Sequence, residues 1–149
     1  MRGATRLGSV EVLAPLSIVA TLTLAHAGKM RAASYLASTA MVASATNLSL
    51  KALIGRARPD VRLHLSKTSG FAFPSGHTMA STAIYGALAL VAGELPLGLR
   101  WLSRIASAAA VAAVGTSRVY LHVHYPSDVL AGWALGAVFP IGFKRLIGV

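Results

Sequence analysis

Five long apolar stretches follow one another along the chain, separated by shorter polar segments. A run of about 20 apolar residues is the length that an α-helix needs to cross the hydrocarbon core of a bilayer. Because the runs show no alternation of apolar and polar residues, they favour helices over the strands of a β-barrel. We expect transmembrane helices at residues 10–27, 32–50, 76–93, 99–117 and 129–147.

The composition supports lipid as the solvent for these helices. Hydrophobic residues make up 55% of the 149 residues, charged residues only 12%, and the mean hydropathy is +0.65. So few polar groups could hardly cover a water-soluble surface. Small residues, such as Gly132 and Gly136, let helix backbones approach closely in lipid. The sequence therefore predicts an all-α fold, an integral membrane helical bundle of about five transmembrane helices, in a single domain over residues 1–149.

The basic residues and the missing cysteines limit what the chain can bind. The net charge of +10 fits an acidic partner, but the cations lie at the ends of apolar runs and form no basic stripe. We therefore expect membrane lipids with anionic headgroups as partners, and no nucleic acid. The absence of cysteine excludes disulfides, thiolate nucleophiles and zinc–thiolate sites.

The N-terminus allows two interpretations. Arg2 and Arg6, followed by an apolar run and "AHAG" at residues 25–28, look like a signal peptide with an Ala-x-Ala cleavage site. A retained first span is favoured, because the apolar run continues to the fourth or fifth helical turn and the other helices need a packing partner.

Three polar clusters interrupt the apolar pattern, and alternation of five spans brings all three to one face of the membrane. The first is segment 51–59, "KALIGRARP". Lys51 and Arg58 are seven residues apart, close to two helical turns, so both can point the same way from a helix end. Pro59 disfavours helix at Arg58. Taken alone, these residues could equally be two cations that reach for the membrane surface.

The second cluster is segment 74–78, "PSGHT", at the start of the third apolar run. Ser75 is a good N-cap residue, and Gly76 allows a ligand to approach the backbone. The free N–H groups of a helix start favour an anion. Taken alone, an ordinary capped helix with an incidental His77 is the simpler explanation.

The third cluster is segment 117–128, "SRVYLHVHYPSD". Pro126 suits the first turn of the next helix, which puts Asp128 just inside that helix and His124 just before it. The carboxylate can then hold one ring nitrogen of His124 as a donor and leave the other free to attack. The alternatives are that Asp128 only compensates the helix dipole and that His124 is an interfacial polar residue, as we expect of His122.

Jointly the clusters gather three basic side chains, a Ser-Gly helix start, two histidines and a carboxylate on one face of a lipid-bound bundle. Such a set predicts a site that binds a phosphate group and transfers it.

These residues resemble the three-part signature of the type 2 phosphatidic acid phosphatase superfamily in type, order and spacing. The matching parts are Lys51-x6-Arg58-Pro59, Pro74-Ser75-Gly76-His77 and Ser117-Arg118-x5-His124-x3-Asp128. The resemblance implies a short variant of the six-helix fold of that superfamily. A truncated start, a natural short form and an incomplete chain all remain open as reasons for five helices.

The resemblance also implies the roles of the site residues. His124 would be the nucleophile that forms a phosphohistidine, with Asp128 holding its ring. His77 would protonate the leaving alcohol and then activate water. The phosphoryl oxygens would be bound by Lys51, Arg58, Arg118, the Ser75 hydroxyl and the Gly76 amide. No metal and no cofactor is expected, and the dispersed carboxylates agree, since Glu11, Asp60, Glu94 and Asp128 cannot enclose Mg²⁺.

The expected function is therefore that of a membrane-bound, metal-independent phosphatase acting on a phosphomonoester or diphosphate of a lipid. One alternative is a vanadate-dependent haloperoxidase-like enzyme, because such enzymes belong to the same superfamily. The other is a non-catalytic membrane protein that binds anionic headgroups. The identity of the lipid and the oligomeric state stay open. Selectivity for the lipid is expected in the helix-lined groove and in residues 60–72. His64 and Lys67 are candidates for contacts with the headgroup, but an exposed loop is the favoured interpretation of this segment.

Membrane orientation is the last expectation. The resemblance places the protein in a bacterial-type inner or plasma membrane, with the active site on the extracytoplasmic face. A count of Lys and Arg favours the reverse, with eight on the side of the clusters and six on the other. Three of those eight belong to the phosphate-binding motifs, so we give the resemblance more weight.

Overall fold

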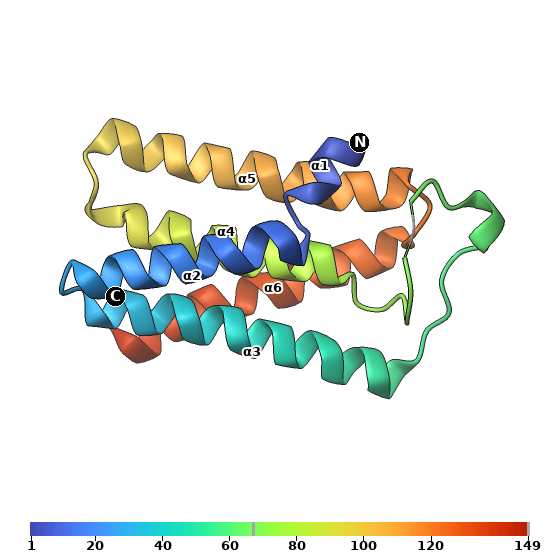
Figure 1. Ribbon diagram of the computed structural model, residues 1–149, viewed down its shortest axis with the longest axis horizontal. Coiled ribbons are helices and arrows are strands. Elements are labelled where there is room, and N and C mark those ends of the chain that lie inside the picture. Colours follow the sequence, from blue (N-terminus) through green and yellow to red (C-terminus); the bar gives the residue numbers. More distant parts are fainter. Residues whose placement is uncertain (67, 149) are drawn as a thin grey trace.

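The structure is a computed structural model that describes residues 1–66 and 68–148 (Figure 1). The expected contact between Lys67 and a headgroup therefore lies outside the described residues. All regular secondary structure in the described part of the chain is helical. The elements are α1 (Arg2–Arg6), α2 (Val10–His26), α3 (Met30–Ile54), η1 (Val61–Leu63), α4 (Gly76–Val91), η2 (Ala92–Glu94), α5 (Leu97–Tyr120) and α6 (Pro126–Ile147).

The five long helices lie side by side, and α4 is the central one, packing on α3, α5 and α6 (Figure 1). Glycines make the contact between α4 and α6 close. A Cβ atom on Gly136 would lie 2.6 Å from the carbonyl oxygen of Met79, and one on Gly132 would lie 3.0 Å from that of Ser75. The prediction that these two glycines allow close packing of helices is therefore confirmed.

The bundle is all-helical, and each of the five expected helices is present. By length and hydropathy, α5 and α6 are long and apolar enough to cross a membrane, and α2 is a shorter apolar helix. Only 6% and 17% of the apolar windows of α5 and α6 are buried inside the protein. Their exposed side chains, such as Leu102 and Ile105 on α5, leave an apolar surface that fits contact with lipid. The count of five spans stays a prediction.

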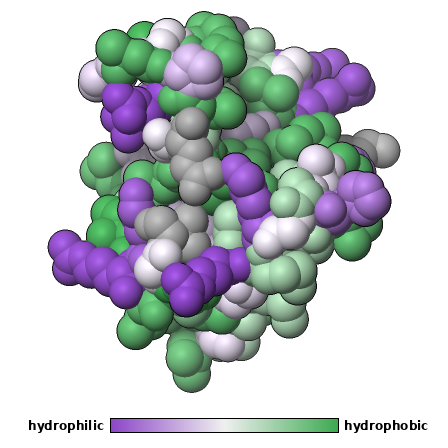
Figure 2. Space-filling view, turned by 90° about the vertical axis from the view of Figure 1, so that its left-hand side faces the viewer, coloured by the Kyte–Doolittle hydropathy of each residue, from purple (hydrophilic) through white to green (hydrophobic). Residues whose placement is uncertain are grey.

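The two ends of the bundle differ in what they carry. Figure 2 looks onto the end where α6 finishes and shows hydrophilic side chains around an otherwise apolar surface. Basic residues at this end include Arg31, Arg100, Lys144 and Arg145, in the first turns of α3 and α5 and the last turn of α6. The opposite end holds α1, the segment between α3 and α4, and the turn between α5 and α6 (Figure 1). All three predicted polar clusters lie at that opposite end.

Candidate active site

Four helices meet at the end of the bundle that carries the clusters, because the chain turns sharply there. Gly55, with a φ of 59°, ends α3 in the left-handed conformation that glycine adopts readily. Pro126 occupies the first turn of α6, as expected. The backbone amide of Ser75, before α4, donates to the carbonyl of Asp128 in α6 at 3.0 Å. This bond joins the second cluster to the third.

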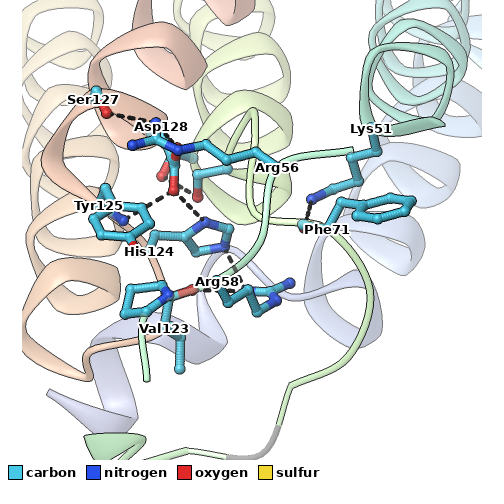
Figure 3. Close-up of polar contacts among 12 residues, drawn as sticks. Lys51, Arg56, Arg58, Phe71, Val123, His124, Tyr125, Ser127 and Asp128 are labelled. Carbon is cyan, nitrogen blue, oxygen red and sulfur yellow. Dashed lines mark hydrogen bonds and ion pairs between the residues drawn. The ribbon is translucent and has the colours of Figure 1, made fainter. Parts of the chain in front are cut away.

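The geometry of His124 defines which of its ring nitrogens carries the proton. Its Nδ1 lies 3.4 Å from Oδ2 of Asp128, and its Nε2 lies 3.1 Å from Nη1 of Arg58 (Figure 3). A guanidinium can only donate, so Nε2 must be the acceptor and therefore unprotonated. Nδ1 then carries the hydrogen and faces the carboxylate. His124 is thus held as the tautomer whose Nε2 lone pair points toward Arg58 and accepts from it.

The environment also keeps His124 neutral. Its side chain is buried, with 3% of its surface exposed. Burial, followed by the positive charges of Arg58 and Arg118, lowers the pKa of His124 below its ordinary value. A neutral imidazole is the form that can act as a nucleophile.

Asp128 is completely buried and is held by three donors. Oδ2 accepts from the backbone amide of Tyr125 at 2.9 Å and faces His124, while Oδ1 accepts from Nη1 of Arg56 at 2.8 Å. The carboxylate therefore occupies the helix start and braces the imidazole at the same time. Compensation of the helix dipole and orientation of His124, the two roles considered for Asp128, are therefore compatible.

Arg58 reaches the site from a loop and not from a helix face. Because α3 ends at Ile54, the expectation that Lys51 and Arg58 point the same way through helical spacing is wrong. Backbone carbonyls position Arg58 instead. Its guanidinium donates to the carbonyl oxygens of Ser69, Gly70 and Val123, all at 2.8–2.9 Å. Lys51, from the last turn of α3, donates to the carbonyl of Phe71. Both cations thus converge on the segment before α4 (Figure 3).

Arg118, in the last turn of α5, is buried with 4% of its surface exposed. Its Nη1 donates to the hydroxyl of Thr5 at 2.7 Å. Its Nε is buried without a hydrogen-bond partner in the described structure. A buried guanidinium that lacks an acceptor is costly unless a ligand supplies one.

The start of α4 contributes Ser75, Gly76 and His77. Ser75 occupies the N-cap position, as expected, but its buried hydroxyl pairs with that of Thr78 at 2.9 Å and makes no capping bond to the helix. Gly76 and His77 line a cavity of about 580 Å³ that also reaches Arg118 and Thr5. Its walls continue along α2 and α3 past Ser17 and Asn47 into the bundle.

The site has an excess of positive charge. The four basic residues Lys51, Arg56, Arg58 and Arg118 outnumber the carboxylates near them: Asp128 pairs with Arg56, and Glu11 lines the same cavity as Arg118. Among the described residues, Lys51, Arg58 and Arg118 have only neutral partners. An anion with more than one negative charge, such as phosphate, would complement this arrangement.

Arg56 was not predicted as a site residue. It lies inside the first motif at a position that the spacing leaves open, yet its guanidinium pairs with Asp128 and stacks over the ring of Tyr125, 4.4 Å from the centroid. Thr5 was also missed, because nothing in a short N-terminal segment indicates contact with residue 118. His122 is exposed and has a φ of 55°.

Comparisons with known proteins give the family. The family model of the PAP2 superfamily matches residues 31–148. Phosphatidylglycerophosphatase B of Bacillus subtilis (strain 168) is 34% identical over 139 residues, which are 91% of this chain and 68% of the relative. The crystal structure of a transmembrane PAP2-type phosphatidylglycerolphosphate phosphatase from Bacillus subtilis matches with a TM-score of 0.88 and 31% identity, covering 97% of this chain and 73% of that one. The chain therefore belongs to the PAP2 superfamily and is a membrane protein.

Other relatives carry different names. A lipid A 1-phosphatase of Rhizobium johnstonii is 39% identical over 62% of this chain and 38% of the relative. A decaprenylphosphoryl-5-phosphoribose phosphatase of Mycobacterium tuberculosis is 37% identical over 66% of this chain and 51% of the relative. The chain thus spans about half or less of the length of these two proteins. All of these relatives are named phosphatases, which supports the same reaction class for this chain.

Proposed function

We propose that this protein is a membrane-bound lipid phosphatase, one domain over residues 1–149, that hydrolyses a phosphomonoester or diphosphate of a lipid. The observation that carries the proposal is the neutral His124, whose unprotonated Nε2 accepts from Arg58 and faces cations that have no carboxylate partner. Binding alone would need the cations only. A nucleophile with an orienting acid is the additional equipment of group transfer.

The first step is transfer of the phosphoryl group to His124. When Arg58 turns its Nη1 donor from Nε2 to a phosphoryl oxygen, the lone pair of Nε2 is released. It attacks phosphorus and forms an N–P bond, while the bond from phosphorus to the leaving oxygen breaks. His77 gives its proton to that oxygen, so the lipid alcohol, or the lipid monophosphate from a diphosphate, leaves carrying that proton. Asp128 stabilises the positive charge that develops on the ring through Nδ1.

The second step is hydrolysis of the phosphohistidine. His77, now neutral, takes a proton from water, and the oxygen of that water attacks phosphorus. The N–P bond breaks and its electron pair returns to Nε2. Inorganic phosphate is released, and both histidines regain their starting protonation states.

Lys51, Arg58 and Arg118 would hold the equatorial phosphoryl oxygens through both steps and stabilise the charge that spreads over them. The uncapped N–H groups at Gly76 would assist. The buried Ser75 hydroxyl, which pairs with that of Thr78, would also bind a phosphoryl oxygen at this start of α4. The lipid part of the substrate fits the cavity beside His77, which runs between α2 and α3 toward the apolar interior.

The mechanism uses no metal ion, because the cations supply the charge stabilisation that Mg²⁺ provides in other phosphoryl transfers. In the described part of the chain, no three His, Asp or Glu side chains gather as ligands. We further propose that the site lies on the extracytoplasmic face of a bacterial-type inner or plasma membrane, with Lys144 and Arg145 at the cytoplasmic end.

The test is a phosphate-release assay on the purified protein in detergent with a chelator. The substrates are phosphatidate, phosphatidylglycerol phosphate, a polyprenyl diphosphate and lipid A, with the His124→Ala protein as the control. We expect release from at least one lipid phosphate by the wild type only. Activity that disappears with the chelator and returns with a divalent metal would contradict the mechanism, and release by His124→Ala would contradict the nucleophile.

A further inference from the structure

The only hydrogen-bond partner of the Arg118 side chain in the described structure comes from the other end of the sequence. Thr5, on α1, accepts from Nη1 at 2.7 Å across 113 residues, and both residues are buried. The bond is made to a neutral oxygen. A carboxylate in the place of Thr5 would neutralise the charge that a phosphate needs, whereas a hydroxyl orients the guanidinium and leaves its charge available.

The segment that carries Thr5 is fitted closely against the site. The phenol of Tyr85, on α4, donates to the carbonyl of Leu7 at 2.8 Å, and Arg2 donates to the carbonyl of Leu65. Gly8 lies so close to α4 and α5 that a Cβ there would be 2.5 Å from Val114 and 3.1 Å from the carbonyl oxygen of His77. Figure 1 shows α1 beside the end of α5 that carries Arg118. The position of Thr5 is therefore well defined by contacts outside α1.

Among the basic residues of the site, Arg118 is the one with an unpartnered buried nitrogen in the described structure. Its Nε is buried and unpartnered, and the residue lines the same cavity as Thr5, Gly76 and His77. With Nη1 tied to Thr5, the guanidinium cannot turn freely, so its other donors keep one direction. A guanidinium fixed on one edge loses less rotamer entropy when a ligand binds its remaining donors.

We propose that Thr5 is a positioning residue of the phosphate site: its hydroxyl holds the buried Arg118 guanidinium so that the free donors meet the phosphoryl group. This inference rests on the proposed function, since it takes the anion bound there to be the phosphate of the substrate. It makes α1 part of the active site, although the three motifs of the family do not include it.

The experiment compares Thr5→Val, which keeps the shape of the side chain and removes the acceptor, with Thr5→Ser, which restores it. Thr116→Val on α5 is the matched control, because the Thr116 hydroxyl is exposed and bonds only to its own helix. The measurements are kcat and KM for the best lipid phosphate, the inhibition constant of orthovanadate, and the stabilisation of each purified protein against heating by orthovanadate.

We expect Thr5→Val to raise KM and the vanadate inhibition constant by about tenfold or more, the usual effect of losing a hydrogen bond that orients a charged group. Thr5→Ser and Thr116→Val should stay close to the wild type. If Thr5 served only to pack α1, Thr5→Val would lower the melting temperature or the active fraction without changing the inhibition constant. That result, or failure of serine to rescue valine, would overturn the inference.

The stabilisation assay separates the two proposals. One outcome is that the wild type releases no phosphate from any lipid, while vanadate stabilises the wild type more strongly than it stabilises Thr5→Val. This outcome would contradict the proposed function and support the role of Thr5. An active wild type with equal vanadate inhibition in Thr5→Val would contradict the role of Thr5 alone.

Discussion

Replacing Asp128 with Asn tests the geometry around the nucleophile most closely. Both carboxylate oxygens face donors only: Oδ1 faces Arg56, and Oδ2 faces the Tyr125 amide and Nδ1 of His124. An amide must turn its NH₂ group toward one of these sets. The less costly choice is to face Arg56, because its side chain is 37% exposed and can turn to water. His124 would then keep its tautomer and lose the negative charge beside it.

The magnitudes follow from this geometry. The lost ion pair with Arg56 is partly exposed, so we expect a decrease of about 1–2 kcal/mol in the free energy of unfolding. The effect on catalysis is larger, because the charge on the imidazole ring in the transition state loses its counter-charge. We expect kcat to fall by about 10²–10⁴-fold, or about 3–5 kcal/mol in the activation free energy.

The assay is phosphate release in detergent, together with a thermal melting curve for each variant. Asp60→Asn is the matched control, since Asp60 is exposed and its carboxylate accepts from the amide of Arg62 two residues on. It should keep the activity of the wild type. A kcat for Asp128→Asn within a few-fold of the wild type, in a protein that melts normally, would refute the role assigned to the carboxylate.

Further outcomes follow from neighbouring features. Arg56→Met should lower kcat by about tenfold and stability by about 1 kcal/mol, since Asp128 keeps its bonds to Tyr125 and His124; an unchanged kcat would exclude a role in positioning. In NMR spectra of the protein with labelled histidine, the ring signal of His124 is the one that disappears in His124→Ala. We expect this signal to show no protonation step at or above pH 6.5, because burial and the cations lower the pKa of His124. A step in that range would contradict the lowered pKa. Gly136→Ala should lower stability by about 1–3 kcal/mol because its Cβ would strike α4, whereas Gly142→Ala, with open space around it, should not; equal melting temperatures would contradict the packing.

Much of the architecture could be predicted from the apolar runs. The helix expected at residues 10–27 is Val10–His26, and the one expected at 129–147 is Pro126–Ile147. Helix ends were harder, because they depend on contacts that hydropathy does not describe. The short α1 has no apolar run and is held by bonds from Tyr85 and Arg2, so only tertiary structure reveals it.

Residues of the site could be predicted where the interacting residues lie close together in the sequence. His124 and Asp128 meet as their spacing of four residues predicts. Arg58 lies in the site for a different reason than expected, since backbone carbonyls of a loop orient it. Arg56 and Thr5 bond to partners 72 and 113 residues away, and spacing within one motif cannot predict such contacts.

The most direct test of the account is to trap the phosphorylated enzyme. His77→Gln should slow hydrolysis of the intermediate more than its formation from a substrate with a good leaving group, so the phosphoenzyme should accumulate. After an alkaline quench, at which a phosphoramidate survives, mass spectrometry should find phosphate on His124 and none in the His77→Gln, His124→Ala double variant. Phosphate on another residue, or turnover of wild-type enzyme with no phosphorylated histidine in either protein, would contradict the central claim that Nε2 of His124 attacks phosphorus.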